Sequence, residues 1–301
     1  MKMKSILSLM LALVMLFPLA GCASTPAPAS DPTPAGTQEP AGNPSAAEPA
    51  TEPAAGSNRV DTVTVAMVSA PDTLHPYNIS GNYGDVIFDM IFDRMIDFHA
   101  DGTIIPRLAT SWESNVGADG VMTMTFHLDP NAKWHDGTPL TADDVVFTAQ
   151  IVTNPAITTN RRYYWASLAG TDSSGACEDP SQLGIKALDQ HTVEYTFKQV
   201  VAPDAYLYIE GRFQYIMPKH LLENIEYFQH PVGSGPLKFD SMVDGERYEM
   251  VANTDYFRGL VNMDRLIVRV MPAANLTPAI ISGEVDAGIG HTLGNILDRK
   301  S

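Results

Sequence analysis

The sequence predicts an α/β fold that contains a small antiparallel β-rich unit. Three kinds of pattern support this prediction. Some segments alternate apolar and polar side chains with the period of a half-buried strand; these are 62–68, 122–128 and 192–198. Others carry apolar side chains at helical spacing; these are 84–97 and 141–152. Three Asp-Gly turn pairs within 40 residues are typical of an antiparallel meander; they are 101–102, 119–120 and 136–137.

The first 57 residues are not expected to belong to this fold. Residues 1–21 predict a signal peptide, because Lys2 and Lys4 precede a short apolar run and small residues follow it. The apolar run is too short for an ordinary membrane-spanning helix. Residues 22–57 are rich in Pro, Ala, Thr, Ser and Glu and lack aromatic residues, which predicts a disordered spacer.

The charge and the cysteines limit the possible partners. The chain has 35 acidic and 19 basic residues and a net charge of −16, which argues against nucleic acid and anionic membrane surfaces as partners. It has two cysteines, Cys22 and Cys177. Cys177 lies in a loop rich in Gly, Ser and Asp, where an unpaired thiol is a better interpretation than a metal ligand or a nucleophile.

The strand 62–68 begins the folded part, and the loop 69–83 follows it. Loops at the end of a core strand often carry ligand contacts, although a plain surface loop explains the same residues. The strand 122–128 is followed by a tight loop, with Trp134 as an aromatic anchor, and then by a helix capped by Thr141. Trp112 and Trp134 are expected to pack the small core of this region.

The run Arg161–Trp165 places two cations beside three consecutive aromatic residues, which cannot all face one core. Tyr163 and Trp165 are therefore expected to form a wall of a ligand groove. Such a cluster can also bind single-stranded nucleic acid, but the net charge opposes this alternative. Arg212, isolated in the apolar segment 206–215, is expected to pair with a carboxylate.

The last third of the chain predicts an α/β unit. Residues 246–253 and 265–271 form strands, 275–282 forms a helix that stops at Gly283, and 284–288 begins another strand. The glycine-rich element 231–236 precedes them. It is not a phosphate loop, because no Gly-Lys-Ser/Thr follows, and a simple turn between domains is the alternative to a ligand contact.

Five stretches in order carry a resemblance to a known family: PDTLHPYN at 71–78, PRLATSWE at 106–113, TFHLDPNAKWHDGTPLTADDVVFT at 125–148, HPVGSGPLKF at 230–239 and ISGEVDAG at 281–288. Together they resemble the family 5 extracytoplasmic solute-binding proteins, which are the oligopeptide, dipeptide and nickel receptors of ABC importers. In addition, Leu-Ala-Gly-Cys at 19–22 resembles a bacterial lipobox, which implies a lipid on Cys22 and a membrane anchor. An ordinary secretory signal is the alternative.

The resemblance implies a periplasmic-binding-protein-like fold, in which two large lobes close on a ligand and a small β-rich subdomain is added. It assigns 58–91 and 201–238 to the first large lobe and 92–200 to the small subdomain. It assigns 239–301 to the start of a second large lobe that is largely missing. The ligand-binding positions that it implies are Ser80, Gly81, Asn82, Ser234 and Gly235. His75 stands where Asp is more usual, and Leu237 stands where relatives have an aromatic residue.

The expected function is to capture peptides outside the membrane and deliver them to the permease, as a lipid-anchored monomer without cofactor, metal or catalytic residues. Nickel, haem or a sugar could replace the peptide within the same class. A surface hydrolase using His135 and Asp136, or a non-functional remnant, are the alternatives of other classes. Because half of the cleft wall is expected to be absent, the chain alone is expected to bind a peptide weakly or not at all.

Overall fold

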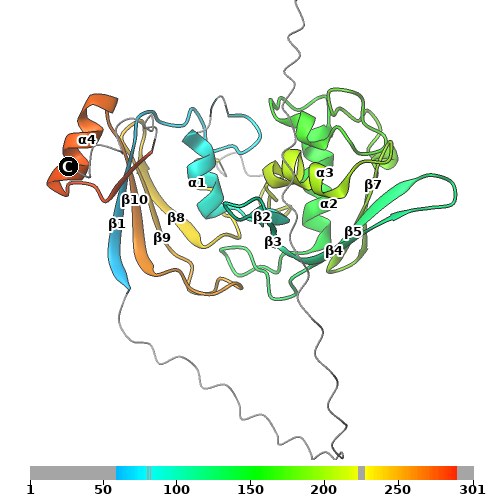
Figure 1. Cartoon of the computed structure of the whole chain (residues 1–301), viewed down its shortest axis with the longest axis horizontal. Helices are drawn as coiled ribbons and strands as arrows, with labels where there is room; N and C mark the ends of the chain where they lie inside the picture. The colour runs from blue at the N-terminus through cyan, green and yellow to red at the C-terminus, as the bar shows by residue number, and fades with distance from the viewer. Residues whose placement is uncertain (1–58, 80, 82, 223–227, 290–301) are drawn as a thin grey trace, which may run out of the picture. The chain divides into compact units, whose positions relative to one another are not determined.

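The computed structural model describes residues 59–79, 81, 83–222 and 228–289. Within these ranges no helix combines the length and the apolar character needed to cross a membrane. The strands form two main sheets and one small hairpin (Figure 1).

The first sheet has five strands in the order β11-β1-β10-β9-β8. Their bounds are Val60–Met67 for β1, Leu237–Val243 for β8, Arg247–Ala252 for β9, Met263–Val270 for β10 and Ala287–Ile289 for β11. Strand β1 is parallel to both β10 and β11, whereas β9 is antiparallel to its neighbours. Helix α4 (Ala273–Ser282) connects β10 to β11 and ends at Gly283, whose φ of 77° suits glycine.

This pairing corrects the predicted domain boundary. Residues 239–289 do not begin a separate lobe, because β9, β10 and β11 share one sheet with β1. Strand β11 likewise pairs in parallel with β1. The error arose because hydrogen bonds between β1 and β10 join residues about 200 positions apart, and local patterns do not report such pairing.

The second sheet is antiparallel throughout, as predicted, with the order β4-β5-β7-β6. It is not a simple meander, because β5 pairs with β7 and not with β6. Its bounds are Ala109–Val116 for β4, Met122–Leu128 for β5, Ile185–Asp189 for β6 and Thr192–Thr196 for β7. Helix α2 (Ala142–Thr153) packs against it and begins after Thr141, as predicted. The turn at Gly137 closes an isolated bridge instead of joining two strands of this sheet.

Helix α1 (Tyr83–Ile91) ends earlier than predicted. The backbone beyond it takes part in other contacts, since the Asp93 amide donates to Ser234 Oγ and Arg94 forms a bridge with Tyr215. Strands β2 (Ile96–Phe98) and β3 (Ile104–Pro106) then form the small hairpin. Helix α3 (Pro203–Ile209) and three short 3-10 helices complete the described elements: Arg162–Trp165, Pro180–Gln182 and Gly211–Phe213.

Apolar side chains are buried on both faces of the first sheet. Met67 belongs to a large cluster that continues through α1 and α2 to the core of the second sheet. Its neighbour Ala66 faces the other side and packs with Leu276 and Ala279 of α4. Cys177 is a free, buried cysteine, and burial raises the pKa of its thiol.

Candidate ligand-binding surface

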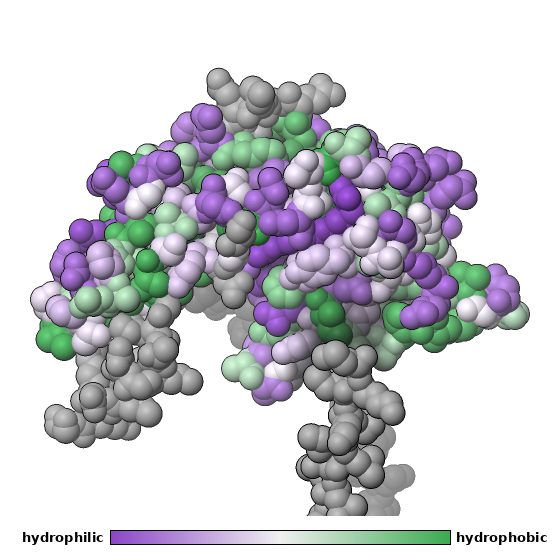
Figure 2. All heavy atoms as spheres, turned by 90° about the horizontal axis from the view of Figure 1, so that it is seen from above, coloured by the Kyte–Doolittle hydropathy of each residue, from purple (hydrophilic) through white to green (hydrophobic). Residues whose placement is uncertain are grey.

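The parallel strands β1, β10 and β11 all end at one edge of the first sheet. In open α/β sheets, ligands bind outside the carboxyl ends of such strands. The loop 68–83, which leads from β1 to α1, starts at this edge. Figure 2 views the molecule from this side, and hydrophilic residues run across the middle of the face between scattered apolar patches.

Two neighbouring residues of the small subdomain hold this loop in place. Asn160 donates through its backbone amide to the Tyr77 carbonyl at 3.0 Å and through Nδ2 to the Ile79 carbonyl at 2.7 Å. Arg161 forms a bidentate ion pair with Asp85 at 2.5 and 3.1 Å and donates to the Gly81 carbonyl at 3.2 Å. A loop fixed at its backbone in this way presents a defined surface to a ligand.

Aromatic rings continue this surface. Tyr163 is 52% exposed and lies 4.2 Å from the Tyr164 ring, measured between centroids. Tyr164 in turn stacks on Phe213 at 4.5 Å. Burial is the main cause that raises the pKa of Tyr164, so this hydroxyl stays protonated at neutral pH. The result is an uncharged, rigid aromatic wall next to the loop held by Arg161.

His75, in the same loop, carries no charge at neutral pH. Its ring stacks on Phe228 with a centroid distance of 4.0 Å, and its Nδ1 accepts a hydrogen bond from the Tyr77 amide. Burial lowers the pKa of His75 to about 4. The residue that stands where relatives usually have Asp therefore brings a neutral side chain to this loop.

Of the site residues that the sequence predicted, some are exposed in the structure, others are buried, and some lie outside the described residues. Gly81 is exposed in the loop held by Arg161, close to the start of α1, and Tyr163 is the exposed ring. Ser80 and Asn82 lie outside the described residues, as does Cys22. The prediction that Trp165 forms a ligand wall is wrong, because its side chain is fully buried between Tyr77 and Tyr195.

Ser234 and Gly235 are also buried, which corrects the prediction that they contact a ligand. The Ser234 hydroxyl accepts from the Asp93 amide, and the Gly235 amide donates to the Ile91 carbonyl at 2.8 Å. A Cβ added at Gly235 would lie 2.5 Å from the Met90 carbonyl oxygen. The glycine-rich element therefore packs closely against the end of α1, just before β8.

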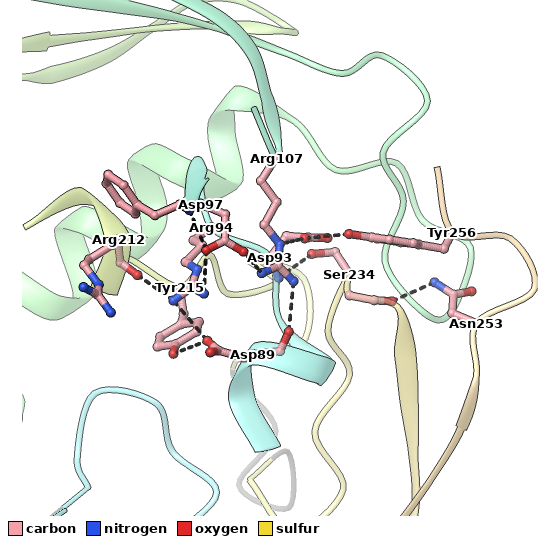
Figure 3. A network of polar contacts seen from close by, with 12 residues as sticks. Asp89, Asp93, Arg94, Asp97, Arg107, Arg212, Tyr215, Ser234, Asn253 and Tyr256 are labelled. Carbon is pink, nitrogen blue, oxygen red and sulfur yellow. Dashed lines mark hydrogen bonds and ion pairs between the residues drawn. The ribbon is translucent and has the colours of Figure 1, made fainter. Parts of the chain in front are cut away.

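A buried polar network adjoins this contact, and sequence reasoning missed it (Figure 3). Arg107 donates through Nε to Asp93 at 2.7 Å, through one terminal nitrogen to Asp97 at 3.1 Å and through the other to the Asp89 carbonyl at 2.9 Å. Tyr256, from the segment between β9 and β10, donates to Asp93 at 3.1 Å. These contacts join α1, the β2–β3 hairpin and the first sheet.

Burial governs the protonation of this network. It raises the pKa of Asp93, which is fully buried, in spite of the attraction of Arg107. Asp97 is only partly buried. Its burial alone would raise its pKa, but Arg94, the Phe98 amide and Arg107 together lower the pKa of Asp97 below its usual value. The charge of Asp93 thus depends on its arginine partner.

The two residues of the hydrolase alternative, His135 and Asp136, have different hydrogen-bond partners. His135 accepts at Nδ1 from the Gly233 amide and contacts the Gly235 carbonyl through Nε2 at 3.0 Å. These partners occupy both ring nitrogens, and burial lowers the pKa of His135 to about 4. Asp136 instead pairs with His220 at 2.7 Å. Among the described residues no group of three or more His, Cys, Asp or Glu is placed to hold a metal ion.

Comparison with known proteins supports the interpretation of the fold. The sequence profile of the bacterial extracellular solute-binding proteins, family 5 (middle region), matches residues 103–300. The periplasmic murein peptide-binding protein MppA of Escherichia coli is 29% identical over 62% of this chain. The periplasmic oligopeptide-binding protein OppA of Salmonella typhimurium is 28% identical over 72% of it. The chain spans 35% and 41% of the length of these two relatives.

Among solved structures, NikZ from Campylobacter jejuni in complex with Ni(L-His) is similar with a TM-score of 0.64 and 26% identity. The match covers 80% of this chain and 46% of NikZ. The profile match extends over more than half of the chain, and it includes the strand, loop and capped helix that the sequence identified as a signature. The chain therefore belongs to the family 5 bacterial extracellular solute-binding proteins.

Proposed function

We propose that this chain captures peptides outside the membrane and delivers them to the permease of an ABC importer. The observation that carries the proposal is the similarity to MppA and OppA, both named as peptide-binding, over 62% and 72% of the chain. The exposed Tyr163 and the loop held by Arg161 form a surface suited to an extended ligand. A peptide held mainly through its backbone would bind with little dependence on its side chains.

Thermal unfolding of the purified chain with a peptide library tests this proposal. Even a weak ligand stabilises the folded state by about 1.4 kcal/mol when its concentration is ten times its Kd. Tyr163→Ala is expected to reduce this stabilisation. Leu260→Ala is the control, because Leu260 is 48% exposed but precedes β10, at the edge of the first sheet opposite to the loop between β1 and α1. Equal effects of the two variants would contradict the proposal, and failure of every peptide to stabilise the chain would favour the alternative that this chain alone does not bind peptides.

A metal complex is the second candidate solute, because NikZ is a structural neighbour and its title names nickel with histidine. The same unfolding experiment with Ni(L-His) in place of peptides separates the two candidates. Stabilisation by the complex and not by any peptide would favour the metal complex.

We propose further that Cys22 carries the lipid anchor, which would keep the receptor close to the permease and raise its effective concentration there. Labelling of a bacterial expression host with radioactive palmitate is expected to mark the wild-type chain and Cys177→Ser equally. Cys22→Ser is expected to lose the label. Label that persists in Cys22→Ser would contradict this anchor.

A further inference from the structure

A groove of about 690 Å³ lies on the small subdomain, outside the surface described above. Three elements form its walls: the β2–β3 hairpin, strand β4 and helix α3. The side chains that line it are mostly apolar; they include Phe98, Ile104, Trp112, Tyr208 and Ile209. Tyr208 and Ile209 are 51% and 61% exposed, which is unusual for two adjacent large side chains at the end of a helix.

Strand β4 leaves the edge of its sheet free below this groove. It is the end strand of the order β4-β5-β7-β6, and no described strand pairs with its outer side. Trp112 of β4 is the cross-strand partner of Phe126, so it lies on the core face of the sheet. An added strand at β4 would therefore present alternate side chains to the groove and extend the small core.

Two charged residues flank the α3 wall of the groove: Asp204 lies in its first turn, and Arg212 follows its end. Arg212 stacks its guanidinium over the rings of Phe98, Tyr208 and Phe213 at 4.7–5.9 Å, and no described carboxylate forms an ion pair with it. The prediction that Arg212 pairs with a carboxylate of this chain is thus wrong for the described residues. Figure 3 shows this guanidinium pointing away from the buried network, while its backbone carbonyl accepts from Arg94. Asp204 lines the groove at the start of α3 and is exposed.

We propose that this groove is a docking site for an extended segment of a partner protein, which pairs with the free edge of β4. The segment carries an apolar side chain in the groove, an acidic residue opposite Arg212 and a basic residue opposite Asp204. Eight residues of near-helical chain separate Asp204 from Arg212, which corresponds to about 12 Å. Four residues of extended chain span about 13 Å, so the two charges belong four positions apart on one face of the added strand.

The probe that follows is the blocked peptide Ac-Lys-Thr-Phe-Thr-Glu-NH2, in which Lys, Phe and Glu lie on the same face of a strand. Of the three tryptophans in the chain, Trp134 and Trp165 are buried, and Trp112 is the partly exposed one that lines the groove. The indole N–H signal of Trp112 in nitrogen-15 NMR spectra, assigned with Trp112→Phe, is therefore a local reporter of occupation.

The whole chain is titrated with this peptide to about 10 mM, and a second titration uses the reverse sequence to test the opposite strand direction. One of the two peptides is expected to shift the Trp112 signal. Tyr208→Ala and Arg212→Gln are each expected to weaken the affinity by about fivefold or more, and Arg212→Lys by less. Tyr163→Ala is expected to weaken the solute site but to leave the affinity read from the Trp112 signal unchanged, so failure here is separate from failure of the proposed solute site. A peptide with Ser in place of Phe, or with N-methylated backbone, is expected not to bind.

The proposal is overturned if neither peptide direction shifts the Trp112 signal. It is also overturned if the affinity is the same in Tyr208→Ala and Arg212→Gln as in the wild type. Binding that is lost in Tyr163→Ala instead would assign the peptide to the solute site and remove the groove as a docking surface.

Discussion

Replacement of Arg107 by Met is expected to destabilise the fold by about 3–5 kcal/mol, which is the usual cost of removing one partner of a buried ion pair. The Arg107 side chain is 6% exposed and the Asp93 side chain 0%. Without the guanidinium, Asp93 would keep the hydroxyl of Tyr256 and the attraction of Arg258, but it would lose its ion pair. A buried carboxylate in this position is strongly disfavoured, because the side chain is shielded from water and no ion pair replaces its lost hydration.

The test is urea unfolding monitored by circular dichroism, applied to a double-mutant cycle. Arg107→Met and Asp93→Leu are each expected to lower the midpoint. The double variant is expected to recover much of the loss, since an apolar pair can replace a buried ion pair at little cost. A loss below about 1 kcal/mol in Arg107→Met, or additive losses in the double variant, would refute the reasoning.

The same variant gives a pH signature with a defined sign. A carboxyl whose pKa is raised in the folded state stabilises folding below the pKa of the unfolded chain, and this contribution disappears as the pH rises through the folded pKa. Arg107→Met should raise the pKa of Asp93 further. The stability difference from the wild type is therefore expected to shrink as the pH falls through the raised pKa of Asp93 in the variant, because the protonated carboxyl no longer needs a cation partner.

Three further outcomes are expected. The pKa of His135 falls from 6.5 to about 4 on folding, so this residue should remove about 3 kcal/mol of stability as the pH drops from 6.5 to 4. His135→Asn should lose this part of the pH dependence of stability in urea titrations. An unchanged pH dependence in the variant would contradict this expectation. Gly233→Ala would place a Cβ 1.8 Å from the Ile91 carbonyl oxygen, so the folded state is expected to lose about 3 kcal/mol or more of stability in thermal unfolding. An unchanged stability would show that α1 can move to make room. Arg161→Met should speed amide hydrogen exchange in residues 75–81 while exchange in β5 stays unchanged; equal protection in both chains would show that Arg161 does not hold the loop.

Local chemistry explains which parts of the fold were predictable. The alternation in 122–128 and the Asp-Gly turn at 120 predicted the pairing of β4 with β5, and the Asp-Gly turn at 102 predicted the β2–β3 hairpin. Both were predictable because strand faces and left-handed turns depend on neighbouring residues. The Thr141 cap and Gly283 likewise marked the start of α2 and the end of α4. In each case the information lies within a few positions of the element.

The errors come from contacts between distant segments. The pattern of 161–165 predicted that some aromatic residues are exposed, but the tertiary packing of Tyr77 and Tyr195 determined that Trp165 is buried and Tyr163 is not. Nothing near Asp93 in the sequence indicates that Tyr256 reaches it. The lone cation Arg212 was expected to find a carboxylate, whereas the fold places three aromatic rings beside it.

The central claim is that the edge of the first sheet, with Gly81 and Tyr163, is the surface that meets the solute. An NMR titration of the chain with the peptide that stabilises it best tests this claim most directly. We predict that the amide signals of Gly81 and Tyr163 shift together with one affinity, and that Tyr163→Ala weakens it. Shifts confined to other surfaces, or none at about 10 mM peptide, would contradict the claim.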